Sequence, residues 1–441
     1  MPPHDKPIAR FFASLSAKSA GLLKYLTAAI FIFIPLYPKF PLFFLPGSAV
    51  AIRAEDFLIG FTTVILVVHL LLTRKFKLPP LGFQVLVYLA IGALSVLSAL
   101  LITKNVNPLL TIFHWARRLE YLLVFFFAYY VGRESWSSRR FLFQLILLPA
   151  IGVFLYGIAQ LYFQAPVIST MNTEFAKGIA LTLQPGVMLS STFAGHYDLA
   201  IYLIMIMAYI SSLLTFTKKK IHLTGLLLGF ITLLWILTQT GSRIAIFGLV
   251  FSISLICFLR KRLALGIILV FLVGASILTS PNLMARLGNL FRVFQSKVQT
   301  SLVIRPVFAA ETLRPIQQDR STSIRFDIEW PRALRSFYKN PILGTGYSSI
   351  TLATDNEYLR ALGETGLLGF AAFIAVLIAL GRGLYYRYLK AGSNLDKIIA
   401  LGTLGAFSAF LISAIFLDVF EASKIAILFW AFTGLAMSTK S

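Results

Sequence analysis

The sequence is poor in charged residues and has a single cysteine. Charged residues make up 13% of the 441 residues and hydrophobic residues 58%, whereas a soluble domain has about 25% charged and about 45–50% apolar residues. The mean hydropathy is +0.82. This composition excludes an ordinary soluble protein and predicts an all-α integral membrane protein that crosses the bilayer many times. Because Cys257 has no second cysteine to pair with, no disulfide can form within the chain.

The chain also lacks the residue spacings that bind metal ions. It has five histidines, but it contains no His-Glu-x-x-His motif, no cluster of cysteine and histidine, and no Asp-x-Asp motif. We therefore expect no metal site and no cofactor.

Acidic residues are scarce beside basic ones. There are 40 Lys and Arg against 17 Asp and Glu, which gives a formal charge of +23. In a soluble protein this excess would suggest a nucleic-acid partner. In a membrane protein the positive-inside rule accounts for many of these charges, so we expect membrane lipids as partners and no nucleic acid.

Long apolar runs predict about twelve membrane-spanning helices. A helix of roughly 17–25 apolar residues spans a bilayer of about 30 Å, and these runs are too long and uniform for barrel strands. A basic start precedes the first run and no Ala-x-Ala cleavage signal follows it, which predicts a retained signal anchor. The runs are 21–38, 57–73, 82–103, 109–131, 141–163, 196–216, 221–240, 243–260, 263–280, 362–386, 398–418 and 422–438.

Charges in the short loops predict the orientation. Lys and Arg gather in alternate loops, which the positive-inside rule assigns to the cytoplasm together with both termini. The chain then divides into about nine helices at 1–280, an extracytoplasmic loop domain at 281–356, and about three helices at 357–441. The cytoplasmic loops contain Arg74, Lys75 and Lys77, then Arg133, Arg139 and Arg140, then Lys218–Lys220, Arg260–Arg262, and Arg387, Lys390 and Lys397.

The long loop is an exception to the charge rule, because it contains ten basic and five acidic residues. A long loop can be translocated regardless of its charge, so a solvated basic domain is one interpretation. The other is a helix over 325–339 that lies on the membrane and offers Arg325 and Arg332 to an anionic head group. Its spacing places basic residues on one stripe and aromatic residues on another. Pro331 would interrupt this helix or lie in its first turn.

Polar residues recur where predicted helices begin at the outer face. In "QTGSRIAIFG" (239–248), Arg243 either reaches a lipid phosphate or faces a cavity as a fixed cation. In "TDNEYLRALGETGLLGF" (354–370), Thr354 and Glu357 fit a capping box. This leaves Asp355 and Asn356 to point from a helix start that favours a nearby phosphate.

Glycines surround the same segment. "NPILGTGYSSI" (340–350) lacks the Gly-Lys-Ser/Thr of a P-loop, so we interpret it as a turn that steers the next segment into position. Gly363, Gly366 and Gly369 recur every three residues, which favours close helix packing.

Three more polar groups lie near the predicted outer face. Arg117, Arg118 and Glu120 lie about two turns inside a span, where charges usually face a protein interior or a wet cavity. Arg117 and Glu120 have the spacing of an ion pair within one helix. The other groups are His196 with Asp198 at a helix start, where either is a cap or a site residue, and Arg53 with Glu55 and Asp56.

These segments, in this order, resemble the O-antigen ligase/polymerase superfamily of bacterial polysaccharide assembly. The resemblance rests on "GSRIAIFG", on "SIRFDIEWPRALRSFYKNPILGTGY", on "DNEYLRALGETGLLGF", and on a long outer loop after about nine spans. It implies a GT-C-like glycosyltransferase of the bacterial inner membrane whose active site faces outward. Such enzymes transfer a glycan from undecaprenyl pyrophosphate to lipid A–core in ligases, to another lipid-linked repeat in polymerases, or to a protein hydroxyl in some relatives.

The resemblance also implies roles for particular residues. Arg243 and Arg325 would hold the pyrophosphate, and Asp355 stands where the ligase motif commonly has histidine before asparagine. We expect Asp355 to be the base or orienter for the acceptor, with His196 in reserve, in a single inverting displacement. Preorganised cations would then stabilise the leaving group without a metal ion. The expected substrate-binding residues are Arg53, Arg117, His196, Asp198, Arg332 and Asn356.

Alternatives from other classes remain open at this point. A transporter or flippase of lipid-linked glycans often shows two similar halves, but we find no internal repeat, and the polar residues gather at one face. A receptor or scaffold would leave the intramembrane group around Arg117 unexplained.

Overall fold

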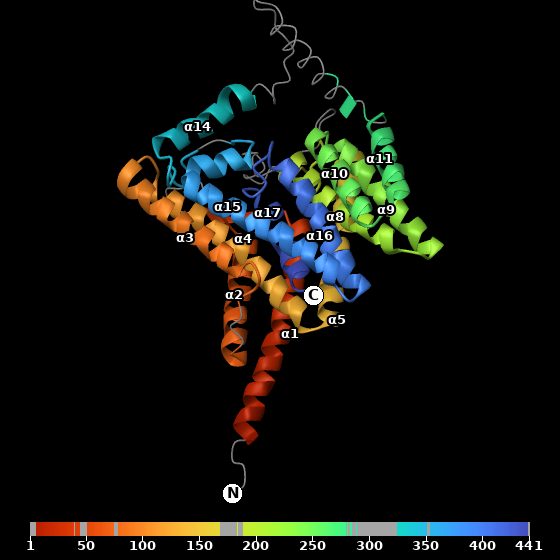
Figure 1. The fold of residues 1–441 in the computed structure, drawn as a ribbon, viewed down its shortest axis with the longest axis horizontal. Coiled ribbons are helices and arrows are strands. Elements are labelled where there is room, and N and C mark those ends of the chain that lie inside the picture. Colours follow the sequence, from red (N-terminus) through yellow and green to blue (C-terminus); the bar gives the residue numbers. More distant parts are fainter. Residues whose placement is uncertain are drawn as a thin grey trace, which may run out of the picture.

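The computed structural model describes residues 6–38, 40–44, 51–74, 78–167, 183, 188–278, 280, 283–284, 288, 324–350 and 353–439. Helices make up most of this part of the chain, as predicted, and they pack side by side (Figure 1). The start of α1 and the short helix α14 lie at opposite ends of the bundle (Figure 1). Six basic residues of the predicted loop domain lie outside the described residues: Arg286, Arg292, Lys297, Arg305, Arg314 and Arg320.

The first half of the bundle follows the predicted runs, except that the first helix begins at Lys6 rather than near residue 21. One difference is that the run at 141–163 forms two helices, because Pro149 starts the second one. Another is a short antiparallel hairpin of two strands before α2. The elements are α1 (Lys6–Leu36), β1 (Pro41–Phe44), β2 (Ala51–Arg53), α2 (Ala54–Thr73), α3 (Gly82–Ser98), the π-helical turn η1 (Ala99–Thr103), α4 (Pro108–Glu134), α5 (Trp136–Leu147) and α6 (Pro149–Tyr162).

The second half also agrees with the predicted boundaries to within a few residues. Pro331 lies in the first turn of α14, as one of the two interpretations of that segment required. The elements are α8 (His196–Phe216), α9 (Lys220–Gln239), α10 (Arg243–Leu259), α11 (Leu263–Leu278), the π-helical turn η2 (Arg325–Glu329), α14 (Trp330–Lys339), α15 (Glu357–Lys390), α16 (Asn394–Ser413) and α17 (Ser423–Met437).

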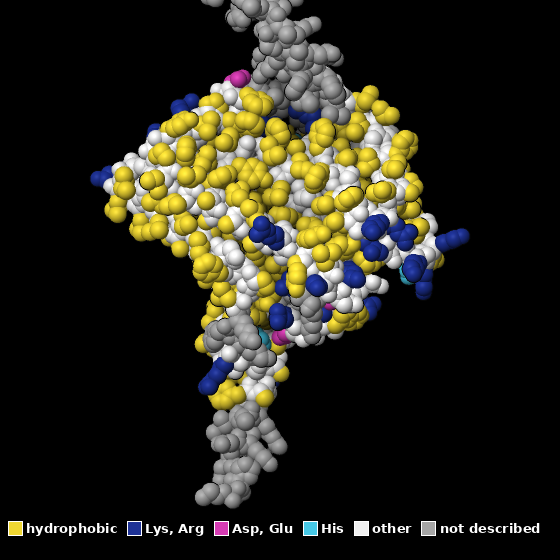
Figure 2. Space-filling model, viewed as in Figure 1, with side chains coloured by type: hydrophobic (Ala, Val, Ile, Leu, Met, Phe, Trp, Pro, Cys, Tyr) yellow, Lys and Arg dark blue, Asp and Glu magenta, His cyan; other side chains and the backbone are white. Residues whose placement is uncertain are grey.

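The chain is a multi-pass membrane protein. Within the described residues, eight segments are long and apolar enough to cross a membrane: α1, α2, α3 with η1, α5 with α6, α8, α9, α15 and α16. The helices α10, α11 and α17 are apolar but shorter than the eight segments. The longer helix α4 is also not among the eight. Figure 2 shows hydrophobic side chains over most of the middle of one face, with Lys and Arg gathered toward its lower right.

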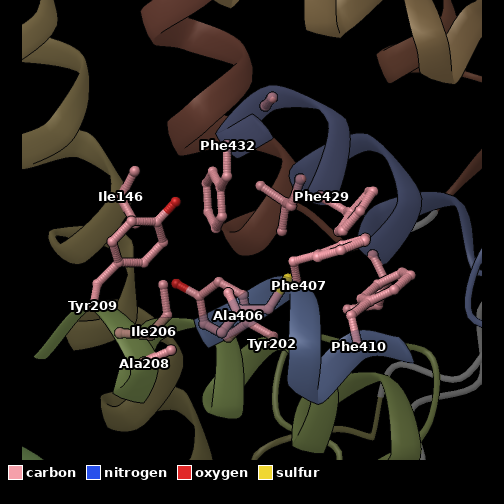
Figure 3. Packing of buried hydrophobic residues seen from close by; sticks show 14 of the residues in the cluster. Ile146, Tyr202, Ile206, Ala208, Tyr209, Ala406, Phe407, Phe410, Phe429 and Phe432 are labelled. Carbon is pink, nitrogen blue, oxygen red and sulfur yellow. The ribbon is translucent and has the colours of Figure 1, made fainter. Parts of the chain in front are cut away.

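The core of the bundle is built around α8, which is buried along almost its whole length. The ring of Tyr209 on α8 lies against that of Phe432 on α17, with centroids 5.7 Å apart (Figure 3). The Tyr209 hydroxyl lies 2.7 Å from Oγ1 of Thr403 on α16. A helix that is apolar on all sides is expected at the centre of such a bundle.

The helix α15 is broken near its amino end. Gly366 has φ 65° and ψ −168°, which is not helical, and the break leaves backbone groups on both sides without helical partners. The segment 341–346 supplies these partners: the amides of Thr345 and Gly346 donate to the carbonyls of Gly363 and Glu364 at 3.1 and 2.8 Å. The amides of Leu367 and Leu368 donate to Pro341 and Ile342 at 2.8 and 3.2 Å. The segment that was predicted to be a turn therefore packs against the break and supplies the hydrogen-bond partners that the helix lacks there.

Candidate functional site

The structure brings Arg325 and Asp355 together, although 30 residues separate them in sequence. Nε and Nη2 of Arg325 both donate to Oδ2 of Asp355, at 2.9 and 2.7 Å. Arg325 is 7% exposed and lies in the π-helical turn η2, a feature that is frequent at functional sites. Two charge-assisted bonds to a buried guanidinium hold both side chains in place.

The segment around Asp355 is held by Asp418, from the loop between α16 and α17. Oδ2 of Asp418 accepts from the amide of Thr354 at 2.8 Å, and Oδ1 accepts from the amide of Asn356 at 3.2 Å. Asp355, between these two amides, has φ 48°, a left-handed conformation that aspartate adopts more readily than most residues. Asp418 therefore fixes the backbone on both sides of Asp355.

The predicted capping box at Thr354 and Glu357 is wrong. The N-cap of α15 is Asn356, whose Oδ1 accepts from the amide of Leu359 at 3.0 Å. Glu357 instead accepts from the amide of Phe420 at 3.0 Å. The left-handed φ of Asp355 explains the difference, because a helix cannot continue back through that residue.

The charged residues in the first turns of α15, which follow Asp355 in the chain, face α4. Arg360 donates to Asp418 at 3.0 Å and to Glu364 at 3.3 Å. Arg118 of α4 lies 3.9 Å from Glu357 and 4.0 Å from Glu364. Buried charges are costly unless they are paired, so this network joins α4 to the part of α15 before Gly366 and supports the adjoining site.

Glu329 is a further carboxylate of the site, in the same turn as Arg325. Its Oε2 is buried and has no hydrogen-bond partner among the described residues. Burial and the charge of Asp355 raise the pKa of Glu329 to about 7, against the opposing effect of Arg325. Burial also raises the pKa of Asp355, although Arg325 lowers it. Carboxylates with raised pKa values are suited to proton transfer near neutral pH.

The other predicted residues lie at helix ends. Arg243 is the first residue of α10 and is half-buried. His196 starts α8, and its ring centroid lies 4.1 Å from that of Tyr197, which in turn lies beside Arg325. Asp198 is in the first turn of the same helix.

The basic stripe predicted for 325–339 is divided in the structure. Arg325 turns inward to Asp355, Arg332 is half-buried, and Arg335 and Lys339 are exposed. The aromatic stripe packs partly on the protein, because Trp330 contacts Phe416 with ring centroids 6.0 Å apart. The segment α14 also packs against α15, so it is held to the bundle through that helix.

Arg53 and Arg117 line a polar cavity of about 160 Å³. Nη2 of Arg117 donates to the carbonyl of Ala51 at 3.2 Å and to Asp56 at 3.4 Å. The predicted pair within α4 is therefore replaced by a pair with Asp56, because the first turn of α2 brings that carboxylate within reach. The cavity is lined by Arg53, His114, Arg117, Arg118, Tyr121, Glu421 and Ser423.

The sequence analysis did not single out Asp418, Glu329 or Tyr197. Each of them had a weak signal in the sequence. Asp418 is an acidic residue in the short loop between α16 and α17, Glu329 lies four residues after Arg325, and Tyr197 lies between His196 and Asp198. None has a motif of its own, so only the tertiary contacts identify them.

A comparison with known proteins agrees with the resemblance drawn from the sequence. Residues 228–374 match the family model described as O-antigen ligase. The match contains Arg243, the pair Arg325 and Asp355, and the broken outer segment of α15. No curated protein sequence matches the chain.

Proposed function

Since this multi-pass membrane protein carries an O-antigen ligase domain, we propose that it transfers a glycan from undecaprenyl pyrophosphate to an acceptor hydroxyl on the extracytoplasmic face. The transfer inverts the anomeric carbon and requires no metal ion. The observation that supports this proposal best is the buried Arg325 bound through two nitrogens to Asp355, at the end of a broken helix. Such a guanidinium suits a pyrophosphate oxygen, and such a carboxylate suits an acceptor proton.

Asp355 accepts from the Nε and Nη2 groups of Arg325, which are also the groups suited to a pyrophosphate oxygen. A pyrophosphate that binds Arg325 competes for the same N–H groups and releases Asp355 from its ion pair. The freed carboxylate has a raised pKa and lies beside the place where the sugar is held. Donor binding would thus prepare the base in the same step.

The reaction then proceeds as a single displacement. The acceptor oxygen forms a bond to the anomeric carbon and gives its proton to Asp355. The bond from the anomeric carbon to the pyrophosphate oxygen breaks, and the pyrophosphate leaves with the electron pair. Arg325 and Arg243 stabilise the developing charge, assisted by the amino end of α15. The residues His196, Asp198, Arg332 and Asn356 complete the walls around the sugar.

This proposal also includes the placement of the chain. With α4, α10, α11 and α17 added to the eight long spans, the bundle would have about twelve crossings in a GT-C-like arrangement. Both termini would be cytoplasmic, in the inner membrane of a bacterium. The pair Arg325 and Asp355 would then face outward, within reach of lipid-linked glycans.

The test is metal-free transfer by the purified protein. The protein is mixed with an undecaprenyl-pyrophosphate glycan and candidate acceptors in the presence of a chelator, and the released lipid pyrophosphate is measured. Arg325→Ala and Arg243→Ala should each reduce turnover about 10²–10³-fold. Arg382→Ala, which removes an exposed arginine near the other end of α15, is the matched control. Unchanged turnover in both site variants would contradict the assigned roles.

Two alternative functions would give different results in the same experiment. A polymerase joins lipid-linked repeats, and Asp355 in place of the ligase histidine favours this reading over a lipid A–core ligase. Its product is a ladder of longer lipid-linked glycans rather than one ligated acceptor. A transporter moves the lipid-linked glycan across vesicles without releasing lipid pyrophosphate.

A further inference from the structure

The polar cavity lined by Arg53 and Arg117 has an unusual concentration of basic groups for its size. Within its volume of about 160 Å³, the described lining includes three guanidinium groups and one imidazole against the single carboxylate of Glu421. These groups come from four parts of the chain: β2, α4, the loop before α17, and α17 itself. Such convergence from separate elements is typical of a binding site rather than of a solvated surface.

Several buried polar atoms of this cavity lack a partner. Nε of Arg53, Nε of Arg118 and Oγ of Ser423 are buried and make no hydrogen bond within the described part of the chain. Arg118 is 8% exposed and Ser423 is 4% exposed. Buried donors are normally satisfied, and leaving one unsatisfied costs about 1–3 kcal/mol. An acceptor bound in the cavity would satisfy these donors.

Two helix amino ends add to the positive potential. Arg53 is the N-cap residue of α2, and Ser423 is the first residue of α17. Helix amino ends attract anions through their unpaired amides and the helix dipole. Both helices begin at this cavity, so their effects act in the same direction as the guanidinium groups.

A carboxylate lies beside each guanidinium group of the cavity. Glu421 contacts Arg118, and Asp56 pairs with Arg117 at 3.4 Å. Arg53 has Glu55 at 3.9 Å, beyond hydrogen-bond distance. Arg53 is thus the cation of the cavity whose charge is least compensated by a direct contact.

The volume of the cavity is also larger than a single ordered water requires. A single water needs only about 10–15 Å³ of such volume, so the space accommodates a tetrahedral oxyanion with a few waters. We propose that this cavity binds a phosphoryl group carried by the lipid of the glycan acceptor. The assignment to the acceptor rests on the proposed function, whereas the anion site itself does not.

Its position fits an acceptor subsite. Arg118 lies 3.9 Å from Glu357, which follows Asp355 by two residues in the chain. An acceptor held at the cavity by its phosphoryl group would have its hydroxyl directed toward Asp355, while the donor pyrophosphate occupies Arg325. The two anions would be kept apart by the network of Arg118, Glu357 and Arg360.

Anion binding is measured by thermal unfolding of the full-length protein in detergent. Inorganic phosphate and a short-chain phosphatidic acid are titrated at constant ionic strength, with chloride as the reference. Because a ligand that binds only the folded state stabilises it, both probes should raise the midpoint of wild-type unfolding. Arg53→Gln should weaken the apparent affinity about tenfold, since a charge-assisted hydrogen bond contributes about 1.5–3 kcal/mol.

Ser423→Ala and Arg382→Gln are the companion variants. The first removes one unpartnered donor with little change of shape, and it carries the test if Arg53→Gln does not fold. It should weaken phosphate binding, whereas Arg382→Gln should leave the titration unchanged. Equal titrations for all four proteins would overturn the site. Stabilisation by inorganic phosphate without any by phosphatidic acid would overturn the assignment to a lipid.

The outcome is separable from the proposed reaction. If no glycan is transferred but the titrations behave as expected, the proposed function fails and the anion site stands. If transfer occurs, Arg53→Gln should raise the KM for the acceptor several-fold and leave the KM for the donor unchanged. A rise in the donor KM alone would place the cavity on the donor side and contradict this proposal.

Discussion

Gly344 and Gly366 approach each other so closely that a methyl group on either would lie 2.5 Å from the backbone nitrogen of the other. Both have positive φ, 70° and 65°. Their contact lets the segment 341–346 enter the break in α15 and form the backbone hydrogen bonds that the helix has lost. This contact positions the part of α15 before Gly366, which begins two residues after Asp355.

Gly366→Ala should therefore destabilise the protein by about 3 kcal/mol or more. Its φ and ψ lie in a region almost restricted to glycine, and the added methyl would meet backbone atoms that cannot move away. Thermal unfolding in detergent measures the effect. The control is Gly229→Ala on α9, where a Cβ would meet no atom within 4 Å and alanine is preferred in a helix. Equal midpoints for the two variants would contradict the role of the break.

Asp418→Asn should lower kcat about tenfold and leave the KM for the donor nearly unchanged. The amide group would face donors with one acceptor oxygen instead of two, so the segment around Asp355 would lose part of its support. Steady-state transfer kinetics measure this split between kcat and KM. Asp327→Asn removes an exposed carboxylate from the turn η2 and should behave as wild type. A normal kcat in Asp418→Asn would show that Asp355 does not depend on this support.

The KM for the donor should rise between about pH 6 and pH 8. Glu329 has a pKa raised to about 7, so it is mostly neutral below that pH and negative above it. The negative form repels a pyrophosphate bound at Arg325, which lies in the same turn. Glu329→Gln should keep the donor KM low across this range, whereas Asp327→Asn should retain the rise. A donor KM that does not change with pH in the wild-type protein would contradict this expectation.

Asp396→Asn should lower the free energy of unfolding by about 3–5 kcal/mol without altering the kinetics of the folded protein. Nε of Arg139 on α5 donates to Oδ1 of Asp396 on α16 at 2.9 Å, and both residues are buried. Removing one partner leaves an uncompensated buried charge. The effect is read from unfolding midpoints, with Arg140→Gln, an exposed neighbour, as the control. A change below about 1 kcal/mol would show that this pair is solvated.

The helices were predictable because apolar runs of membrane length carry their own signal. The start of α8 at His196 and the start of α10 at Arg243 were both read correctly from the sequence. The break at Gly366 was not, because its cause is a contact with Gly344 that no helical periodicity reveals. The hairpin before α2 was missed for a similar reason, since its strands are short and pair only with each other.

Site residues were predictable where they belong to a recognised motif. They were not predictable where only a tertiary contact places them in the site. Arg325 and Asp355 came from recognised segments, and the structure places them 2.7 Å apart. Arg117 was expected to pair along its own helix, but Asp56 from α2 takes that place. Asp418 acts through two backbone amides, and such a role leaves no pattern in the sequence.

The buried position of α8 has a consequence for biogenesis. Its Tyr209 and Ser212 direct hydroxyl groups to α16, which the ribosome makes nearly 190 residues later. Until then these groups must face lipid, the insertion machinery or a chaperone. A chain that stops before α16 would therefore be inserted but unfinished, with polar groups exposed to hydrocarbon and open to quality-control proteolysis.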